Sequence, residues 1–247
     1  MISILANPVR FKKFARFASP FFGILALICI IAGIWFGIWH SPEDQFQGHS
    51  VRIMYVHVPA AWSAMMAYGV MASASLIAFI WRHPLADELA KACALPGAVF
   101  TALALLTGSL WGKTSWGTYW QWDGRMTSVL ILLFLYIGYM SIWNIIEDKK
   151  KAARIAGLVA MVGSINIPII KFSVDWWNGL HQSATISSVN APGLVTEMLI
   201  PLLLLAIGYS FFFGWLVINR VLHAIHIAKQ TRQNTPKANT KISLETL

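Results

Sequence analysis

The sequence predicts an all-α integral membrane protein whose six transmembrane helices form one bundle. Hydrophobic residues make up 57% of its 247 residues and charged residues only 12%, and the mean hydropathy is +0.62. An average soluble domain carries about 25% charged residues. Six apolar runs are long enough to cross a hydrocarbon core of about 30 Å, which needs about 20 helical residues. These runs are 21–39, 54–81, 92–112, 126–146, 155–172 and 198–219.

The individual runs differ in ways that affect the prediction. The run 21–39 follows a basic start but is too long for a signal-peptide core and lacks a cleavage site, so we expect a retained helix. The 28 residues of 54–81 would reach about 42 Å as a helix, so one end projects or tilts. The short run 155–172 contains Pro168, which predicts a kink. Short connections predict one membrane domain over 1–220, followed by a basic, disordered tail over 221–247.

The net charge of +9 is interpreted as a topology signal. The basic residues lie in short segments between apolar runs, which argues against a nucleic-acid partner. With a cytoplasmic N-terminus, 15 of the 19 lysines and arginines fall in cytoplasmic segments. The positive-inside rule therefore predicts that both termini are cytoplasmic. The four cations left outside are Arg52, Lys113, Arg125 and Lys171.

The stretch 111–123, WGKTSWGTYWQWD, holds four tryptophans, a tyrosine and one acid. Trp and Tyr are favoured at membrane interfaces because they combine an apolar ring with a polar N–H or O–H. An aromatic belt needs only scattered residues of this kind, whereas here they fill a predicted outer loop. Gly112 and Gly117 would let the backbone approach a flat ligand. We interpret the stretch as a binding platform, with an aromatic belt as the alternative.

Two of the seven histidines lie among aromatic and apolar residues at the predicted outer boundary. His57 lies at the start of the run 54–81, and His181 follows Trp176 and Trp177 in VDWWNGLHQ. A single boundary histidine is usually an interfacial hydrogen-bonding residue. Two histidines on either side of an aromatic platform favour haem as the flat ligand, because histidine ligates haem iron in many proteins.

The outward cations and the acid of the platform each have two interpretations. The cations could pair with haem propionates, arginine most favourably through bidentate contacts, or with lipid headgroups. Asp123 could hydrogen-bond the ligand or a metal-bound group, or cap the helix 126–146. Helical spacing would place Trp116, Trp120 and Asp123 on one side, whereas an extended loop would not.

The sequence offers little for other kinds of chemistry. Cys29 and Cys93 lie inside apolar runs and are interpreted as buried filler. GKT at 112–114 lacks the upstream glycine pattern of a phosphate loop. No pair of residues is an evident nucleophile and base. The sequence thus favours binding and transfer over enzymatic catalysis.

Several segments of the sequence resemble those of a known family. The stretch 111–123 is similar to the tryptophan-rich WGxxWxWD signature of the haem-handling proteins of cytochrome c maturation, and HVPAAW and WWNxLHQ flank it as they do in that superfamily. The six-helix size and the segments GAVFTALALLTGSLWGK and PIIKFSVDWWNGLHQ resemble the CcmC family in particular. The resemblance covers about residues 15–220.

The resemblance implies that His57 and His181 are axial ligands of haem b and that the signature residues Trp116, Trp120, Trp122 and Asp123 hold it. It further implies a bacterial inner-membrane protein with its site on the periplasmic side. Its partners would be the subunits CcmA, CcmB and CcmD of a haem export complex and the haem chaperone CcmE. The candidate haem contacts are Trp111, Lys113, Trp116, Tyr119, Trp120, Trp122, Asp123, Arg125, Arg52, Trp176 and Trp177.

Three other functions are weighed against this one. A cytochrome c synthetase shares the tryptophan signature but generally has more helices or a large outer domain. A cytochrome b-like electron-transfer subunit usually ligates haem within facing transmembrane helices. A structural transporter subunit with an aromatic belt would bind no haem.

Overall fold

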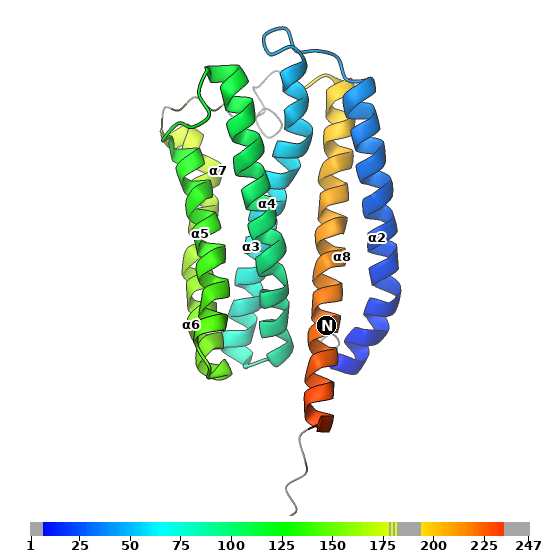
Figure 1. Ribbon diagram of the computed structural model, residues 1–247, viewed down its shortest axis with the longest axis vertical. Coiled ribbons are helices and arrows are strands. Elements are labelled where there is room, and N and C mark those ends of the chain that lie inside the picture. The colour runs from blue at the N-terminus through cyan, green and yellow to red at the C-terminus, as the bar shows by residue number, and fades with distance from the viewer. Residues whose placement is uncertain (1–6, 178, 180, 182–193, 235–247) are drawn as a thin grey trace, which may run out of the picture.

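The structure is a computed structural model that describes residues 7–177, 179, 181 and 194–234. Its helices run side by side along one long axis (Figure 1). Six segments within these ranges are long and apolar enough to cross a membrane, which confirms the predicted all-α fold. The helices are α2 (Pro8–Trp39), α3 (Met54–Trp81), α4 (Pro84–Trp116), α5 (Gly124–Ile145), α6 (Lys149–Gly163), α7 (Asn166–Trp176) and α8 (Thr196–Asn234), with the 3-10 helix η1 (His49–Ile53) before α3.

Helix α4 is longer than the predicted run and includes the first half of the tryptophan-rich stretch. It ends at Trp116, because Gly117 adopts the left-handed conformation, with φ 79°, and its N–H donates to the Lys113 carbonyl. Glycine favours this position because it has no Cβ to clash there. The helical spacing considered for the whole stretch therefore does not extend to Trp120 and Asp123.

The predicted span 155–172 is built from two helices. Helices α6 and α7 are separated by residues 164–165, so the break precedes Pro168 and does not lie at it. Pro168 is the third residue of α7, where its missing N–H needs no intrahelical partner. At the break, Asn166 donates from Nδ2 to the Ser128 carbonyl of α5, 2.8 Å away. The break is thus tied to the neighbouring helix.

The predicted disordered tail is partly wrong, because α8 continues to Asn234. The sequence contains no glycine or proline between Gly214 and Pro236, so nothing local interrupts the helix. The early turns of this extension also pack against the start of α2. The remaining residues of the predicted tail, 235–247, lie outside the described residues.

The long helices pack in pairs, with α2 along α8 and α3 along α4 (Figure 1). Glycine permits the close approach of α2 and α8. A Cβ at Gly208 of α8 would lie 2.8 Å from Ile30 Cγ1, and one at Gly33 of α2 would lie 2.5 Å from Leu205 Cγ. Small residues at helix interfaces are the usual means of close packing in membranes, where no hydrophobic force drives association.

The main core lies between α3, α4, α5, α6, α7 and α8 and contains three fully buried tyrosines: Tyr68, Tyr136 and Tyr139. Tyr68 and Tyr136 meet edge to face, with ring centroids 5.0 Å apart. The Tyr136 hydroxyl donates to the Ala64 carbonyl at 2.8 Å. A buried hydroxyl needs such a partner where water is excluded.

Different loops and helix ends lie at the two ends of the bundle. One end carries the loop 40–53, the end of α4, the start of α5 and the end of α7 (Figure 1). The opposite end carries the start of α2 and the end of α8. All the described candidate haem residues therefore lie at the end away from the termini.

Candidate functional site

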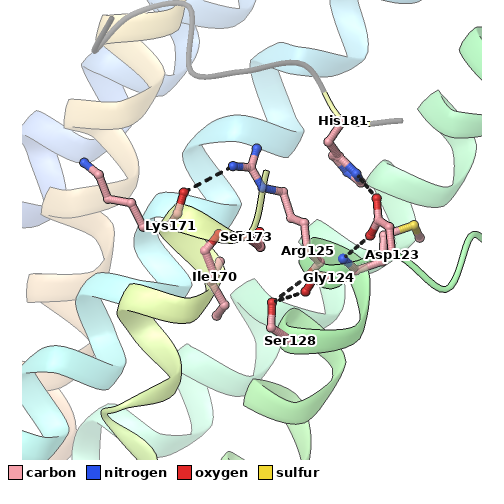
Figure 2. Close-up of polar contacts among 9 residues, drawn as sticks. Asp123, Gly124, Arg125, Ser128, Ile170, Lys171, Ser173 and His181 are labelled. Atoms are coloured by element: carbon pink, nitrogen blue, oxygen red, sulfur yellow. Dashed lines mark hydrogen bonds and ion pairs between the residues drawn. The ribbon is translucent and has the colours of Figure 1, made fainter. Parts of the chain in front are cut away.

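Asp123 is the residue that connects the tryptophan-rich stretch to the rest of the site. Its Oδ1 accepts the Met126 N–H at 2.7 Å and caps α5, which confirms the predicted N-cap. Its Oδ2 lies 2.6 Å from His181 Nδ1 (Figure 2). The Asp123 side chain is only 6% exposed. One carboxylate thus starts a helix and holds a histidine from a segment 58 positions later.

The geometry at His181 determines which ring nitrogen is available to a metal. A carboxylate only accepts hydrogen bonds, so His181 Nδ1 donates its proton to Asp123. Burial lowers the pKa of His181, and Asp123 offsets part of that effect. The neutral ring therefore carries its lone pair on Nε2. The edge of the ring meets Trp116, with centroids 4.7 Å apart and planes at 66°.

His57 also carries its ring proton on Nδ1, although its hydrogen-bond partners differ from those of His181. Its Nδ1 lies 3.0 Å from the Ala104 carbonyl and 3.2 Å from Thr107 Oγ1, both on α4. A carbonyl accepts, so Nδ1 carries the proton and Nε2 is left with the lone pair. A Cβ at Gly108 would lie 2.8 Å from His57 Cε1, so a glycine is needed where the ring rests on α4.

The last two turns of α4 place an indole against each histidine. The Trp111 ring lies 5.7 Å from the His57 ring, at 73°. Trp111 also donates from Nε1 to Gln47 Oε1 at 2.6 Å. Trp111 and Trp116 are five positions apart, which is about 7.5 Å along the helix axis and about 140° around it. The two histidines therefore lie on different flanks of the same helix end.

The rest of the stretch is more open. Trp120 and Trp122 pack edge to face at 5.2 Å, and Trp122 is 75% exposed. The Trp120 Nε1–H is buried and has no hydrogen-bond partner in the described part of the chain. Tyr119 is exposed, with Lys113 Nζ 5.3 Å above its ring. Lys113 also donates to the Gly117 carbonyl at the end of α4.

The two tryptophans before His181 have different surroundings. A Cβ at Gly124 would lie 2.8 Å from Trp177 Cε3, so Trp177 packs on the start of α5 directly after Asp123. Trp176 stacks on Phe172 with centroids 5.7 Å apart and is largely exposed. Of the two, Trp177 is the one that lies against the start of α5.

The two predicted arginines lie at the same end of the bundle. Arg125 extends from the first turn of α5, and its Nη2 lies 3.5 Å from the Lys171 carbonyl (Figure 2). Arg52 Nη2 donates to the Ser41 carbonyl at 3.3 Å, and its Nε is buried without a partner in the described residues. Neither guanidinium is paired with a carboxylate among the described residues.

Two supporting residues were not predicted from the sequence. Gln47 was part of a polar loop with no distinguishing motif, and Thr107 was one residue of an apolar run. Gln47 fixes the Trp111 indole and Thr107 contacts His57 Nδ1. Only the spacing of Thr107 from Trp111, one helical turn, could have indicated that both face the same neighbour.

Comparison with known proteins gives the family. A model of the CcmC family, described as "Heme exporter protein C", matches residues 1–236. The chain belongs to the CcmC family. Three CcmC-type relatives illustrate the range of organisms in which similar chains occur. A protein named "Heme exporter protein C" from Bradyrhizobium diazoefficiens is 50% identical over 209 residues, 85% of this chain and 79% of its own.

The other two relatives are more distant. The protein of the same name from Escherichia coli K12 is 44% identical over 181 residues, 73% of this chain and 74% of its own. A "Putative cytochrome c biosynthesis ccmC-like mitochondrial protein" from Marchantia polymorpha is 42% identical over 199 residues, 81% of this chain and 84% of its own. The CcmC family predicted from the tryptophan-rich signature is confirmed.

Proposed function

We propose that this CcmC-family protein binds haem at the end of the bundle away from its termini and passes it on for the biogenesis of c-type cytochromes. The observation that carries the proposal is the common hydrogen-bonding pattern of His57 and His181. Each donates from Nδ1 to a fixed oxygen and so keeps the Nε2 lone pair. The names of the relatives, which refer to haem export and cytochrome c biosynthesis, support this function.

The hydrogen bonds at both histidines are those typical of metal ligands. A ligating histidine usually donates its other ring N–H to a carboxylate or a backbone carbonyl, which fixes the tautomer and raises the basicity of the ligating nitrogen. Asp123 supplies the carboxylate for His181, and Ala104 supplies the carbonyl for His57. Haem contributes four nitrogens of its own, so two histidines would complete the coordination of the iron.

The surrounding residues fit the other parts of haem. Trp116, Trp120 and Trp122 offer ring surfaces to the flat porphyrin. The Trp120 Nε1–H and Arg52 Nε are buried donors without a partner among the described residues, and such groups are costly unless a ligand accepts from them. Arg52 and Arg125, neither paired with a described carboxylate, are candidates for the propionates. Trp111, Lys113, Tyr119, Trp176 and Trp177 are proposed to complete the wall of the site.

The location and partners follow from charge and family. The excess of lysine and arginine at the other end of the bundle supports cytoplasmic termini and a periplasmic haem site in the bacterial inner membrane. We propose transfer of haem b to the chaperone CcmE within an assembly with CcmA, CcmB and CcmD. Its own contribution in this proposal is to ligate and release haem.

The experiment is a haem spectrum of the purified protein, recorded with and without CcmE. We expect a low-spin spectrum for the wild type, and loss of that ligation in His57→Ala and in His181→Ala. The control is His49→Ala, because His49 lies at the same end but is exposed and paired with Glu43 at 2.8 Å. A wild type without haem under either condition, or wild-type ligation in both variants, would overturn the proposal.

A second measurement separates haem delivery from electron transfer. A cytochrome b-like subunit would keep its haem when CcmE is added, whereas a delivery protein would lose it.

Thiol labelling tests the side of the membrane. A cysteine at the exposed Lys113 should react with an impermeant thiol reagent from the periplasmic side. Labelling from the cytoplasmic side alone would reverse the topology.

A further inference from the structure

A second candidate site lies at the opposite end of the bundle from the histidine pair. A pocket of about 370 Å³ opens between the start of α2 and residues 222–226 of α8. It is lined by Lys12, Arg16, Leu222, His223 and His226. Four of the five lining side chains are hydrogen-bond donors that can carry positive charge, so the pocket is suited to an anion.

The basic lining residues come as one pair from each helix. Lys12 and Arg16 are four positions apart on α2, and His223 and His226 are three apart on α8, so each pair lies on one helix face. Like charges at this spacing repel each other. No carboxylate among the described residues forms an ion pair with any of the four. An anion from outside the chain would therefore relieve a repulsion that these residues leave in place.

The two helices that form the pocket are held at a defined distance. Ser19 of α2 and Asn219 of α8 are hydrogen-bonded to each other, with Asn219 Nδ2 2.9 Å from Ser19 Oγ. Asn219 Nδ2 also donates to the Trp215 carbonyl on its own helix at 2.7 Å. Beside this bond, Ala15 and Ile218 are buried in a small apolar cluster. These contacts hold together the two helices that form the pocket.

We propose that this pocket binds the phosphate of an anionic phospholipid headgroup. Its residues lie just outside the apolar runs 21–39 and 198–219, and basic pockets between transmembrane helices bind such headgroups. Phe14 and Phe17 of α2 are 47% and 76% exposed in the neighbouring turns. These rings favour a lipid over free phosphate, because they offer apolar surface to acyl chains.

The test uses the full-length protein and a matched pair of double variants. Lys12→Gln with Arg16→Gln removes the two cations of the α2 wall. Arg10→Gln with Lys13→Gln removes the same charge from exposed positions on the same turns that do not line the pocket. Retention of phosphatidylglycerol is measured by native mass spectrometry after extraction from vesicles of phosphatidylglycerol and phosphatidylcholine. Circular dichroism checks that both variants keep the helical content of the wild type.

We expect wild type to retain phosphatidylglycerol in preference to phosphatidylcholine. The pocket variant should bind it about 30-fold more weakly, since each cation near a headgroup contributes roughly fivefold. The control variant should stay within about threefold of wild type. Equal loss in both variants, or equal retention of the two lipids, would overturn the proposal. Displacement of the lipid by millimolar inorganic phosphate would also overturn it and would show a free-anion site.

Leu222→Trp provides a test that leaves every charge in place. The larger side chain would fill the pocket that Leu222 lines, so retention of phosphatidylglycerol should fall as it does in the charge variant. Unchanged retention would mean that the lipid binds elsewhere on the basic surface. The charge variants and Leu222→Trp leave the end of the bundle with His57 and His181 unchanged. Haem ligation therefore tests the proposed function separately.

Discussion

His181 Nδ1 and Asp123 Oδ2 are 2.6 Å apart, while the other oxygen of the same carboxylate accepts the N–H of Met126 that begins α5. A change in the orientation of that helix start would therefore move the histidine as well (Figure 2). The final acid of the tryptophan-rich signature has two tasks, and substitutions can separate them.

Asp123→Asn and Asp123→Ala should differ in what they lose. Asparagine is as good an N-cap as aspartate, so Asp123→Asn should unfold at nearly the wild-type temperature. Asp123→Ala should lose about 1 kcal/mol of stability with the cap. Both remove the charge that orients His181 and raises its basicity, so both should weaken haem binding by about 10- to 100-fold. Thermal unfolding and haem titration measure the two effects, and wild-type haem affinity in Asp123→Asn would contradict this role.

Gly108→Ala should displace His57. The new methyl group would lie 2.8 Å from His57 Cε1, so the ring or α4 must move, and the hydrogen bond to Ala104 should be lost. We expect the haem spectrum to lose its six-coordinate character, because His57 would ligate the iron more weakly. Gly138→Ala is the matched control, because a Cβ there would meet no described atom within 4 Å beyond its own stretch of helix. An identical spectrum in both variants would show that His57 does not depend on this contact.

Gln47→Leu should loosen Trp111. The indole N–H would lose its acceptor, which costs about 1–3 kcal/mol when the donor is left buried. Because Trp111 lies against His57, the variant should also broaden or shift the haem absorption band. Gln45→Leu changes an exposed glutamine of the same loop and should be silent. Equal effects of the two substitutions would argue against a specific contact.

The protonation of His181 should show the effect of its surroundings. Burial lowers its pKa and Asp123 partly restores it, so the haem-free protein should titrate at His181 below the ordinary value of about 6.5. Above that value the ring is neutral in both the folded and the unfolded protein. As pH falls from there towards the folded pKa, the unfolded chain binds the proton first and stability is lost.

Asp123→Asn should lower the pKa of His181 still further. Removing the carboxylate removes the hydrogen bond and the charge that raise the His181 pKa, so the titration midpoint should move to still lower pH. The measurement is an NMR titration of the His181 ring in wild type and variant. A midpoint that rises in Asp123→Asn would show that the carboxylate does not stabilise the charged ring.

The sequence by itself determined the number of spans and the family. A hydrocarbon core requires about 20 apolar helical residues, so apolar runs can be counted along the chain, and 54–81 matches α3 at both ends. The N-cap at Asp123 was also predictable, because capping is a local preference. Local pattern failed at 221–234, where polar composition suggested disorder but contact with α2 and the lack of a helix breaker extend α8.

Only the tertiary structure decided which groups meet at the site. Asp123 and His181 are 58 positions apart, His57 and Ala104 are 47 apart, and Gln47 and Trp111 are 64 apart. Such contacts depend on how each helix is rotated about its axis and how far it slides along its neighbours. A one-residue shift turns a helical side chain by about 100°, so composition and spacing cannot specify the partner. The ring nitrogen left for a metal is therefore a property of the packed bundle.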